Sequence, residues 1–224
     1  MPPATPDDAR LPLTVEQLWT YPVKSCAGVR LSSVELLETG LEWDRTWMVV
    51  DESGEFVTQR ELPRMALIQP AFKLDQLVLR APGMLALHLS LDGVEAPCRV
   101  RVWDDEVKAW DLGDLPAQWF SDFLGRPARL VRFDPDQRRL SSVRWTGAVE
   151  APNAFSDGYP VLVTSTGSLD ELNARLARAG QGAVDQRRFR PNLVLEGLDA
   201  HGEDLADELL IEGPDGPVHL RLVK

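Results

Sequence analysis

The chain has 224 residues and a formal net charge of −11, because 35 acidic side chains outnumber 24 basic ones. This charge argues against general affinity for nucleic acid or membrane lipid, so we expect small molecules or proteins as partners. Two cysteines, Cys26 and Cys98, are too few for a disulfide framework; such sparse usage is typical of a reduced compartment and predicts a cytoplasmic protein. No uninterrupted apolar run of about 18 residues occurs, so no membrane-spanning helix is expected.

The first half of the sequence predicts a β domain over residues 13–133. Residues 1–12 are rich in proline and polar residues and are expected to form a disordered tail. Beyond them, short apolar-alternating runs are separated by turn residues, which favours a β-barrel or β-sandwich. Turn sequences at 51–54 and 91–93 predict hairpins with antiparallel partners. The runs that predict strands are LTVEQLW, VRLSSVELL, RTWMVVD, EFVTQR, MALIQP, FKLD, LVLRA, LALHLSL and CRVRVW.

The first predicted helix begins after Asp114 and ends at Gly125, because apolar and aromatic residues between them recur at helical spacing. After a further strand, ARLVRF, the charged and Pro/Gly-marked residues 134–153 are expected to form a linker or lid between two halves. The second domain is predicted over residues 154–224.

This second domain begins with a predicted strand and helix. Ser168, with Glu171 three residues on, predicts a capping box for a helix that ends at Gly180. The predicted strands of this half are 160–164, 192–195, 208–212 and 218–223. Together, the two halves predict a mainly β (α+β) fold with a few helices.

Two runs near the N-terminus could bind an anion. In YPVKSCAG, an apolar strand ends in a turn that presents the Lys24 ammonium, the Ser25 hydroxyl and backbone N–H groups, which together can hold a phosphate. A solvated lysine at a strand end would give the same pattern. In GLEWDRTW, Arg45 and Asp44 lie between two tryptophans, and an ordinary structural ion pair is the alternative to a ligand contact.

Two arginine-rich runs follow. Arg60 and Arg64 flank a proline turn and could line the same anion site as Lys24 or form a solvated rim. In QRRFRPNL, three arginines form a local basic patch before an apolar strand, and Asn192 adds an amide that can contact a heterocycle edge. The alternative is an arginine-rich solvated loop.

Motifs for several common sites are missing. The sequence lacks GxGxxG, Walker A, HExxH and Cys-x-x-Cys patterns, which excludes Rossmann, P-loop, zincin and zinc-ribbon sites. The three histidines are scattered, and no serine lies in a nucleophile elbow. The sequence therefore assigns no catalytic residue and no metal ligand.

Taken in order, the four runs resemble the MOSC family with its N-terminal MOSC-associated β domain, of the amidoxime-reducing type. The resemblance implies a MOSC-type β-barrel preceded by the N-terminal β domain, and a site for a pterin-dithiolene molybdenum cofactor (molybdopterin). The matching stretches are YPVKSCAGV, GLEWDRTWMVVDESGEFVTQRELPRMALI, AFSDGYPVLVTSTGSLDELNARL and RFRPNLVLEGLDAHGEDLADELLI.

The same resemblance implies roles for individual residues. Lys24 and Ser25 match positions that hold the cofactor near its phosphate end, and Arg45 matches one that reaches the same ligand. Arg190 and Asn192 would clamp the cofactor from the second half. Further implied cofactor-binding positions are Arg60, Arg64, Ser165, Thr166, Ser168 and Arg188.

The resemblance also implies a metal ligand. A cysteine thiolate would hold the metal, and this cysteine would lie in a turn just after the strand that here reads VHLRLVK. The printed sequence ends at Lys224, before such a cysteine, so we expect a MOSC domain that is incomplete at its C-terminus. Cys26 and Cys98 do not occupy the matching position and are expected to be structural thiols. Whether the chain binds the cofactor without that cysteine is left open.

For the intact protein, the resemblance implies a molybdenum-dependent oxidoreductase. It would reduce N-hydroxylated or N-oxide compounds with electrons from a separate redox protein, because nothing in the sequence resembles a flavin or iron–sulfur domain. The alternatives are a non-catalytic cofactor carrier and a sulfur-transfer module. A pyridoxal phosphate Schiff base at Lys24 ranks below these, since the chain has only four lysines.

Overall fold

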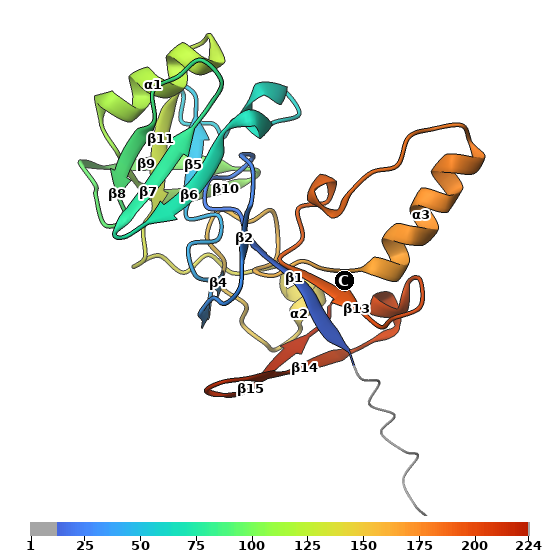
Figure 1. Ribbon diagram of the computed structural model, residues 1–224. Helices are drawn as coiled ribbons and strands as arrows, with labels where there is room; N and C mark the ends of the chain where they lie inside the picture. The colour runs from blue at the N-terminus through green and yellow to red at the C-terminus, as the bar shows by residue number, and fades with distance from the viewer. Residues whose placement is uncertain (1–12, 224) are drawn as a thin grey trace, which may run out of the picture. The chain divides into compact units, whose positions relative to one another are not determined.

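The computed structural model describes residues 13–223, which divide into two compact units (Figure 1). The inserted unit is Leu18–Leu162, and the outer unit combines the residues up to Gln17 with those from Val163 onward. The predicted tail lies outside the described residues, and the predicted domain boundaries stay predictions. Among the described residues, no helix is both long and apolar enough to cross a membrane.

Antiparallel strands form most of the inserted unit. The first strand, β1 (Thr14–Thr20), belongs to this unit only from Leu18 onward. The others are β2 (Val29–Leu31), β3 (Leu36–Leu37), β4 (Gly40–Leu41), β5 (Trp47–Val50), β6 (Gln69–Lys73), β7 (Gln76–Arg80), β8 (Leu87–Ser90), β9 (Ala96–Val102), β10 (Asp105–Asp111) and β11 (Arg129–Phe133). The order β5-β11-β10-β9 makes a four-stranded sheet, and β6-β7-β8 makes a three-stranded one. The end of β1 pairs with β2, and β3 pairs with β4. These sheets are open.

β5 contains only apolar residues because both of its faces are buried. Successive side chains point to opposite faces of a sheet. Trp47 and Val49 accordingly enter one apolar core, and Met48 and Val50 enter another. Each of the four is at most 4% exposed. The unbroken run WMVV therefore fixes β5 between two apolar layers, where it can support the turn that follows β1.

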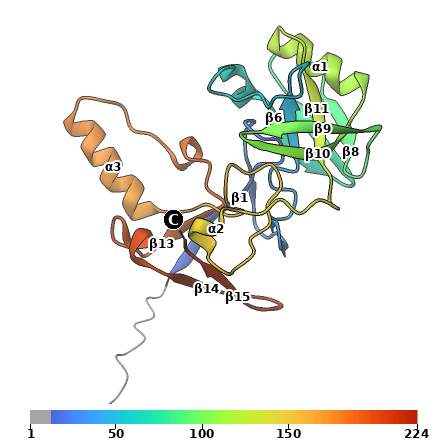
Figure 2. The ribbon, with the colours of Figure 1, turned by 180° about the vertical axis from the view of Figure 1, so that it is seen from behind.

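Helix α1 (Asp114–Leu124) confirms the helix predicted in this region. Its buried face carries Trp119, Phe120 and Phe123, and it lies against β11 (Figure 2). Gly125 ends the helix in the left-handed conformation, at φ 73°. The segment after β11 contains only one short helix, α2 (Val143–Thr146).

Three strand predictions and one hairpin prediction for this unit are wrong. VRLSSVELL is not one strand but contains β2 and β3. MALIQP is not one strand, because Pro63–Leu67 forms a 3₁₀ helix, η1, and only the end of the run belongs to β6. EFVTQR forms only isolated bridges, such as Val50 with Phe56. The turn at 91–93 does not make a hairpin, since β8 pairs with β7 and β9 pairs with β10. It connects two different sheets instead.

The outer unit contains a strand–helix–strand connection and a hairpin. β12 (Val163–Ser165) leads into α3 (Thr166–Arg178), and β13 (Leu193–Glu196) runs parallel to β12. α3 and the β14–β15 hairpin (Glu208–Gly213 and Gly216–Arg221) extend from β13 in different directions (Figures 1 and 2). The short helices are η2 (Gln186–Arg188) and η3 (Gly202–Leu205). Strands predominate over the chain, so the mainly β (α+β) class is confirmed.

The predicted capping box of α3 is wrong. Ser165, not Ser168, is the N-cap, and its Oγ accepts a hydrogen bond from the Ser168 backbone N–H at 3.1 Å. Glu171 does not reach back to the cap but pairs with Arg175 and His201. The helix begins earlier than predicted because two serines three residues apart both follow an apolar strand, and the sequence does not distinguish them.

Candidate functional site

Lys24 lies in a tight turn that directly follows β1. The Lys24 backbone N–H donates to the Trp47 carbonyl at 2.8 Å, and the Cys26 N–H donates to the Val23 carbonyl at 3.0 Å. Val23 and Cys26 are fully buried and anchor the turn in the core next to β5. Ser25 between them takes the left-handed conformation, at φ 68°. The turn therefore holds Lys24 inward, where the residue is only 6% exposed.

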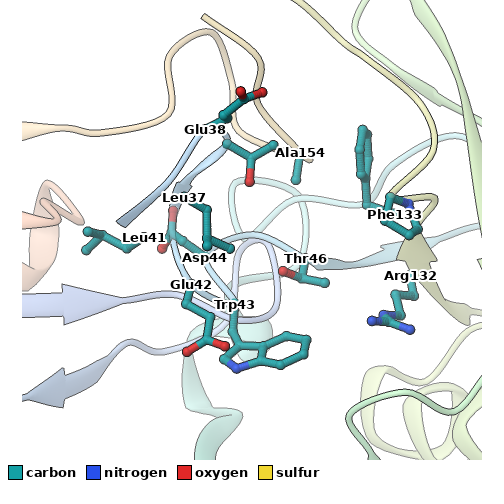
Figure 3. Close-up of a pocket in the computed structure, with 12 residues that line it drawn as sticks. Leu37, Glu38, Leu41, Glu42, Trp43, Asp44, Thr46, Arg132, Phe133 and Ala154 are labelled. Carbon is teal, nitrogen blue, oxygen red and sulfur yellow. The ribbon is translucent and has the colours of Figure 1, made fainter. Parts of the chain in front are cut away.

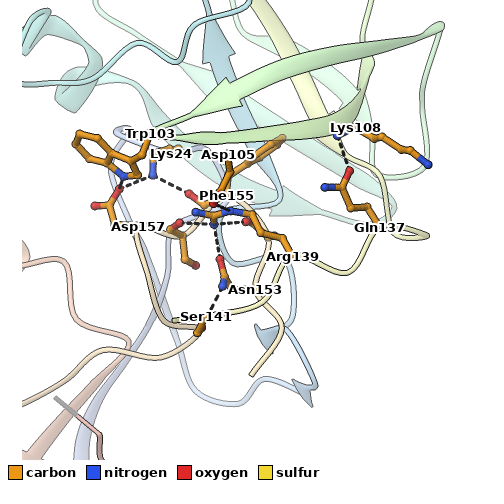
Figure 4. Close-up of polar contacts among 12 residues, drawn as sticks. Lys24, Trp103, Asp105, Lys108, Gln137, Arg139, Ser141, Asn153, Phe155 and Asp157 are labelled. Carbon is orange, nitrogen blue, oxygen red and sulfur yellow. Dashed lines mark hydrogen bonds and ion pairs between the residues drawn. The ribbon is translucent and has the colours of Figure 1, made fainter. Parts of the chain in front are cut away.

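The Lys24 ammonium is bound on two sides (Figure 4). Its Nζ donates to the Phe155 carbonyl at 2.7 Å and to Asp157 Oδ1 at 2.6 Å. The same Asp157 oxygen accepts the Trp103 indole N–H at 3.1 Å. The Lys24 charge also lies 5.5 Å from the centre of the Phe56 ring. Lys24 is thus a buried, paired cation, not a solvated lysine at a strand end.

Burial and neighbouring cations set the pKa of Lys24. Burial lowers this pKa from 10.5 to about 8, against the attraction of Asp157, and the charges of Arg139 and Arg45 lower it further. Burial would raise the pKa of Asp157, but Lys24 and Trp103 together hold it below its ordinary value. The surroundings of Lys24 therefore favour a further negative charge.

Arg45 and Lys24 both form hydrogen bonds with the backbone of Phe155. The Phe155 N–H donates to the Arg45 carbonyl at 3.1 Å, while the Phe155 carbonyl accepts from Lys24. Arg45 is in the left-handed conformation, at φ 49°, and its guanidinium lies 4.5 Å from the centre of the Tyr21 ring. The guanidinium also pairs with Asp44, which is buried and accepts the Tyr21 N–H at 2.8 Å. Arg45 therefore forms the structural ion pair with Asp44 and also lies close enough to Lys24 for its charge to lower the pKa of Lys24.

Arg60 lies at the exposed edge of this group. Its guanidinium is 5.7 Å from the centre of the Trp103 ring, and its charge helps to lower the pKa of Asp157. Arg64, in contrast, lies over the Phe123 ring at 4.6 Å. The structure therefore brings Lys24, Arg45 and Arg60 together around Phe155 and Asp157, whereas Arg64, on η1, packs against Phe123 of α1.

A buried arginine that the sequence did not single out completes this group. Arg139 is 8% exposed, and its guanidinium donates to Asp105 at 2.8 Å and to the Ala154 and Ser156 carbonyls at 3.0 and 2.7 Å. It also donates to the Asn153 side chain (Figure 4). No local signal separates Arg139 from its exposed neighbour Arg138. We call Lys24, Arg45, Arg60, Trp103, Arg139 and Asp157 the Lys24 cluster.

A separate pocket of about 380 Å³ is lined in part by Asp44, the ion-pair partner of Arg45 (Figure 3). It contains Trp43 and Asp44 from the second run but none of the predicted cofactor-binding residues. Arg132 lies 5.9 Å from the Trp43 ring centre, and its buried Nε has no hydrogen-bond partner among the described residues. The lining residues are Leu37, Glu38, Thr39, Leu41, Glu42, Trp43, Asp44, Thr46, Arg132, Phe133, Pro135 and Ala154.

In the outer unit, Ser165 is committed to local structure. It is fully buried; its Oγ caps α3 and donates to Glu203 Oε2 at 2.8 Å, and its N–H donates to Glu203 Oε1 at 3.2 Å. Burial would raise the pKa of Glu203, but hydrogen bonds from Ser168 and Ser165 hold it below its ordinary value. Thr166 follows as the first residue of α3. The Ser165 hydroxyl thus closes the start of the helix.

The remaining predicted residues lie along the segment that leads into β13. Arg188 is exposed on η2, Arg190 is partly buried at φ 60°, and Asn192 is 1% exposed. Ser165 pairs in register with Leu195, whereas Asn192 precedes the residue that pairs with Val163. At about 3.3 Å per residue, the Ser165–Thr166 turn and Asn192 therefore lie at opposite ends of the β12–β13 pair.

Comparisons with known proteins match nearly the whole chain. The MOSC N-terminal beta barrel domain model matches residues 12–127, and the MOSC domain model matches residues 150–222. The human mitochondrial amidoxime-reducing component 1 is 39% identical over 219 residues, which cover 94% of this chain and 63% of that protein. The human mitochondrial amidoxime reducing component 2 is 36% identical over 207 residues, which cover 88% of this chain and 61% of that protein.

A third relative extends the range of functions. The human molybdenum cofactor sulfurase is 29% identical over 218 residues, which cover 89% of this chain and 24% of that protein. The chain thus spans less than two thirds of the length of the relatives it matches. These matches confirm the family that the four sequence runs resemble. The chain belongs to the MOSC family, with a MOSC N-terminal beta barrel domain followed by a MOSC domain.

Proposed function

We propose that this chain binds a molybdenum cofactor, with the Lys24 cluster holding its phosphate end. We further propose that the chain is part of an oxidoreductase that reduces N-hydroxylated compounds with electrons from a separate protein. The observation that carries the proposal is the buried Lys24 ammonium, gathered with Arg45, Arg60 and Arg139 around one loop. The names of the amidoxime-reducing relatives support the reaction, and the name of the sulfurase supports the cofactor.

The Lys24 cluster fits a phosphate group chemically. Its four cations outnumber the three carboxylates that pair with them, on Asp44, Asp105 and Asp157. Charge-assisted hydrogen bonds are strongest where water is excluded, and Lys24 and Arg139 are both buried. A phosphate dianion beside Lys24 would raise its pKa from about 8 toward the ordinary value. Such a site gains charge balance when an anion enters.

Each residue would have a distinct part in binding. Lys24 would supply a point charge, the Ser25 hydroxyl a directed hydrogen bond, and the Arg45 guanidinium a fork for two oxygens. Arg60, which is exposed, would guide the anion toward the site. The bound cofactor would supply the redox chemistry. Among the described residues, no group of three or more His, Cys, Asp or Glu could hold a metal ion, so we assign no metal ligand.

By family match alone, Arg190 and Asn192 are proposed as contacts to the pterin. Arg190 and Asn192 lie just before β13 and carry the donors and acceptors that a polar heterocycle needs. Ser165, Thr166 and Arg188 are proposed as further contacts on the same basis of family match. The buried Ser165 hydroxyl already has two partners, so its backbone is the more accessible part.

Sulfur transfer is the alternative suggested by the sulfurase relative. A sulfur carrier needs an accessible thiolate. Cys26 is fully buried, and burial raises the pKa of Cys98. Both properties disfavour thiolate chemistry at these cysteines. Cofactor carriage without catalysis and a pyridoxal phosphate adduct at Lys24 remain further alternatives, and the cytoplasmic location stays a prediction.

The test is cofactor content. The chain is expressed in cells that synthesise the molybdenum cofactor, and pterin is measured per chain by fluorescence of its oxidised product. We expect Lys24→Met to lose most of the pterin and Lys73→Met, at an exposed lysine, to retain it. Thermal unfolding is used to check that both variants are folded. Equal pterin in the two variants, or no pterin in the parent chain, would contradict the proposal.

A further inference from the structure

Asp157 differs from the other partners of the buried cations. Its side chain is 64% exposed, although it lies 2.6 Å from an ammonium that is almost fully buried. The residue that follows, Gly158, has open space around it, because a Cβ added there would meet nothing within 4 Å. The Asp157 side chain thus reaches Lys24 from the solvent side of the cluster.

The second acceptor of Lys24 is, in contrast, fixed in place. Phe155 is fully buried, packs edge-on against the Phe133 ring at 5.3 Å, and is held to Arg45 by its backbone N–H. Its carbonyl cannot leave Lys24 without disturbing the core. Of the two acceptors, only the Asp157 carboxylate can rotate away into water.

We propose that Asp157 is a built-in counterion of Lys24, which an anionic group of the ligand displaces when it binds. This inference rests on the proposed function, because it takes the Lys24 cluster to be an anion site. In the empty site, Asp157 balances the Lys24 charge. In the filled site, the ligand anion takes its place, and the loop that carries Asp157 is released.

The surroundings of Asp157 make this exchange easy. A phosphate or sulfate dianion offers more negative charge and more acceptor oxygens than a carboxylate. The displaced carboxylate returns to water, in which it is already mostly exposed, and it stays near the Arg60 charge. Trp103, which loses its acceptor, is 42% exposed, so water can replace the hydrogen bond. The exchange therefore leaves no buried group without a partner.

The experiment compares two variants that each remove one negative charge. Asp157→Asn removes the proposed counterion, and its amide oxygen can still accept the Trp103 N–H. Asp105→Asn is the matched control, because Asp105 pairs with Arg139 in the same network, whereas Lys24 donates to Phe155 and Asp157. The full chain is titrated with sulfate at low salt and about pH 6, where sulfate stays a dianion and Lys24 stays protonated. The NMR signal of the Trp103 indole N–H reports binding.

We expect Asp157→Asn to bind sulfate about tenfold more tightly than the parent chain, and Asp105→Asn to gain no more than about threefold from the general change in charge. The Trp103 signal of the parent chain should move toward the position of a hydrated indole as sulfate binds. Sulfate affinity in Asp157→Asn that is equal to or weaker than in Asp105→Asn would overturn the inference. Loss of sulfate binding in Lys24→Met locates the ion, and pterin content tests the proposed function separately.

Discussion

The two units use similar polar residues in different ways. In the inserted unit, Lys24 and Arg139 are buried cations whose partners come from residues distant in the sequence. In the outer unit, Ser165 is equally buried but uncharged; its hydroxyl caps the helix that it precedes and donates to Glu203, 38 positions later. The buried cations of the inserted unit therefore define a charged site, whereas the neutral Ser165 hydroxyl fixes the start of a helix.

The two kinds of buried group differ in how much stability is lost when their partners are removed. A buried charge that loses its partner carries a large desolvation penalty, so the inserted unit is held in one arrangement by its network. A lost helix cap affects one helix end. Substitutions should therefore separate the two units by the size of their effect on stability.

Arg139→Ala should have the largest effect. It leaves Asp105 and Asn153, as well as the Ala154 and Ser156 carbonyls, without their buried partner. Asp105 can be solvated, but Asn153, Ala154 and Ser156 are buried and lose their donor. We therefore expect the free energy of unfolding of the inserted unit to fall by about 3–5 kcal/mol, as measured by urea denaturation. The control is Arg138→Ala, whose ion pair with Glu150 is exposed and should contribute less than about 1 kcal/mol. Similar losses in both variants would show that burial of Arg139 does not matter.

Ser165→Ala should have an intermediate effect, confined to the outer unit. It removes the cap of α3 and one hydrogen bond to Glu203. We expect a loss of about 1–3 kcal/mol. Ser142→Ala is a close control, because Ser142 stands at the N-cap of α2 without a side-chain cap hydrogen bond. Hydrogen exchange of the first turn of α3 measures the effect, and unchanged protection there would argue against the assigned cap.

The pH dependence of stability should show the smallest effect, when the change in the free energy of unfolding is taken per pH unit. The pKa of Lys24 is about 8 in the folded chain and near 10.5 in the unfolded one, so unfolding takes up a proton between these values. Stability therefore rises with pH across this window, by at most about 1.4 kcal/mol per pH unit. Lys24→Met should lack this rise, and Lys108→Met, at an exposed lysine, should retain it. Parallel stability curves for the parent chain and Lys24→Met would contradict the lowered pKa.

The elements with a strong local pattern were predictable from the sequence. The run WMVV predicts a buried strand and α1 follows from its aromatic spacing and its terminal glycine. The 3₁₀ helix at Pro63 and the sheet change at 91–93 were not predictable in this way, because strand pairing is decided by contacts between distant residues. A turn sequence marks where the chain bends but not which strands then pair.

The residues of the candidate site also differ in whether a local sequence pattern or a distant contact reveals them. Lys24, Ser25 and Arg45 stand in compact runs that present anion-binding groups, so the sequence could single them out. Asp157 lies 133 positions from Lys24, and its role depends on that contact. Arg138 and Arg139 are adjacent and identical in type, yet only the second is buried. The path of an irregular segment decides which of the two enters the network.

The order of synthesis gives a final consequence of the inserted unit. Lys24 leaves the ribosome long before Phe155 and Asp157, its partners 131 and 133 positions later. Closing so long a loop is slow and costs chain entropy, so the cluster can form only near the end of this unit's synthesis. The first residues of β1 become part of a folded unit even later, because the rest of the outer unit begins at Val163. Any partner that loads a ligand into the Lys24 cluster must therefore act after Asp157 has been synthesised.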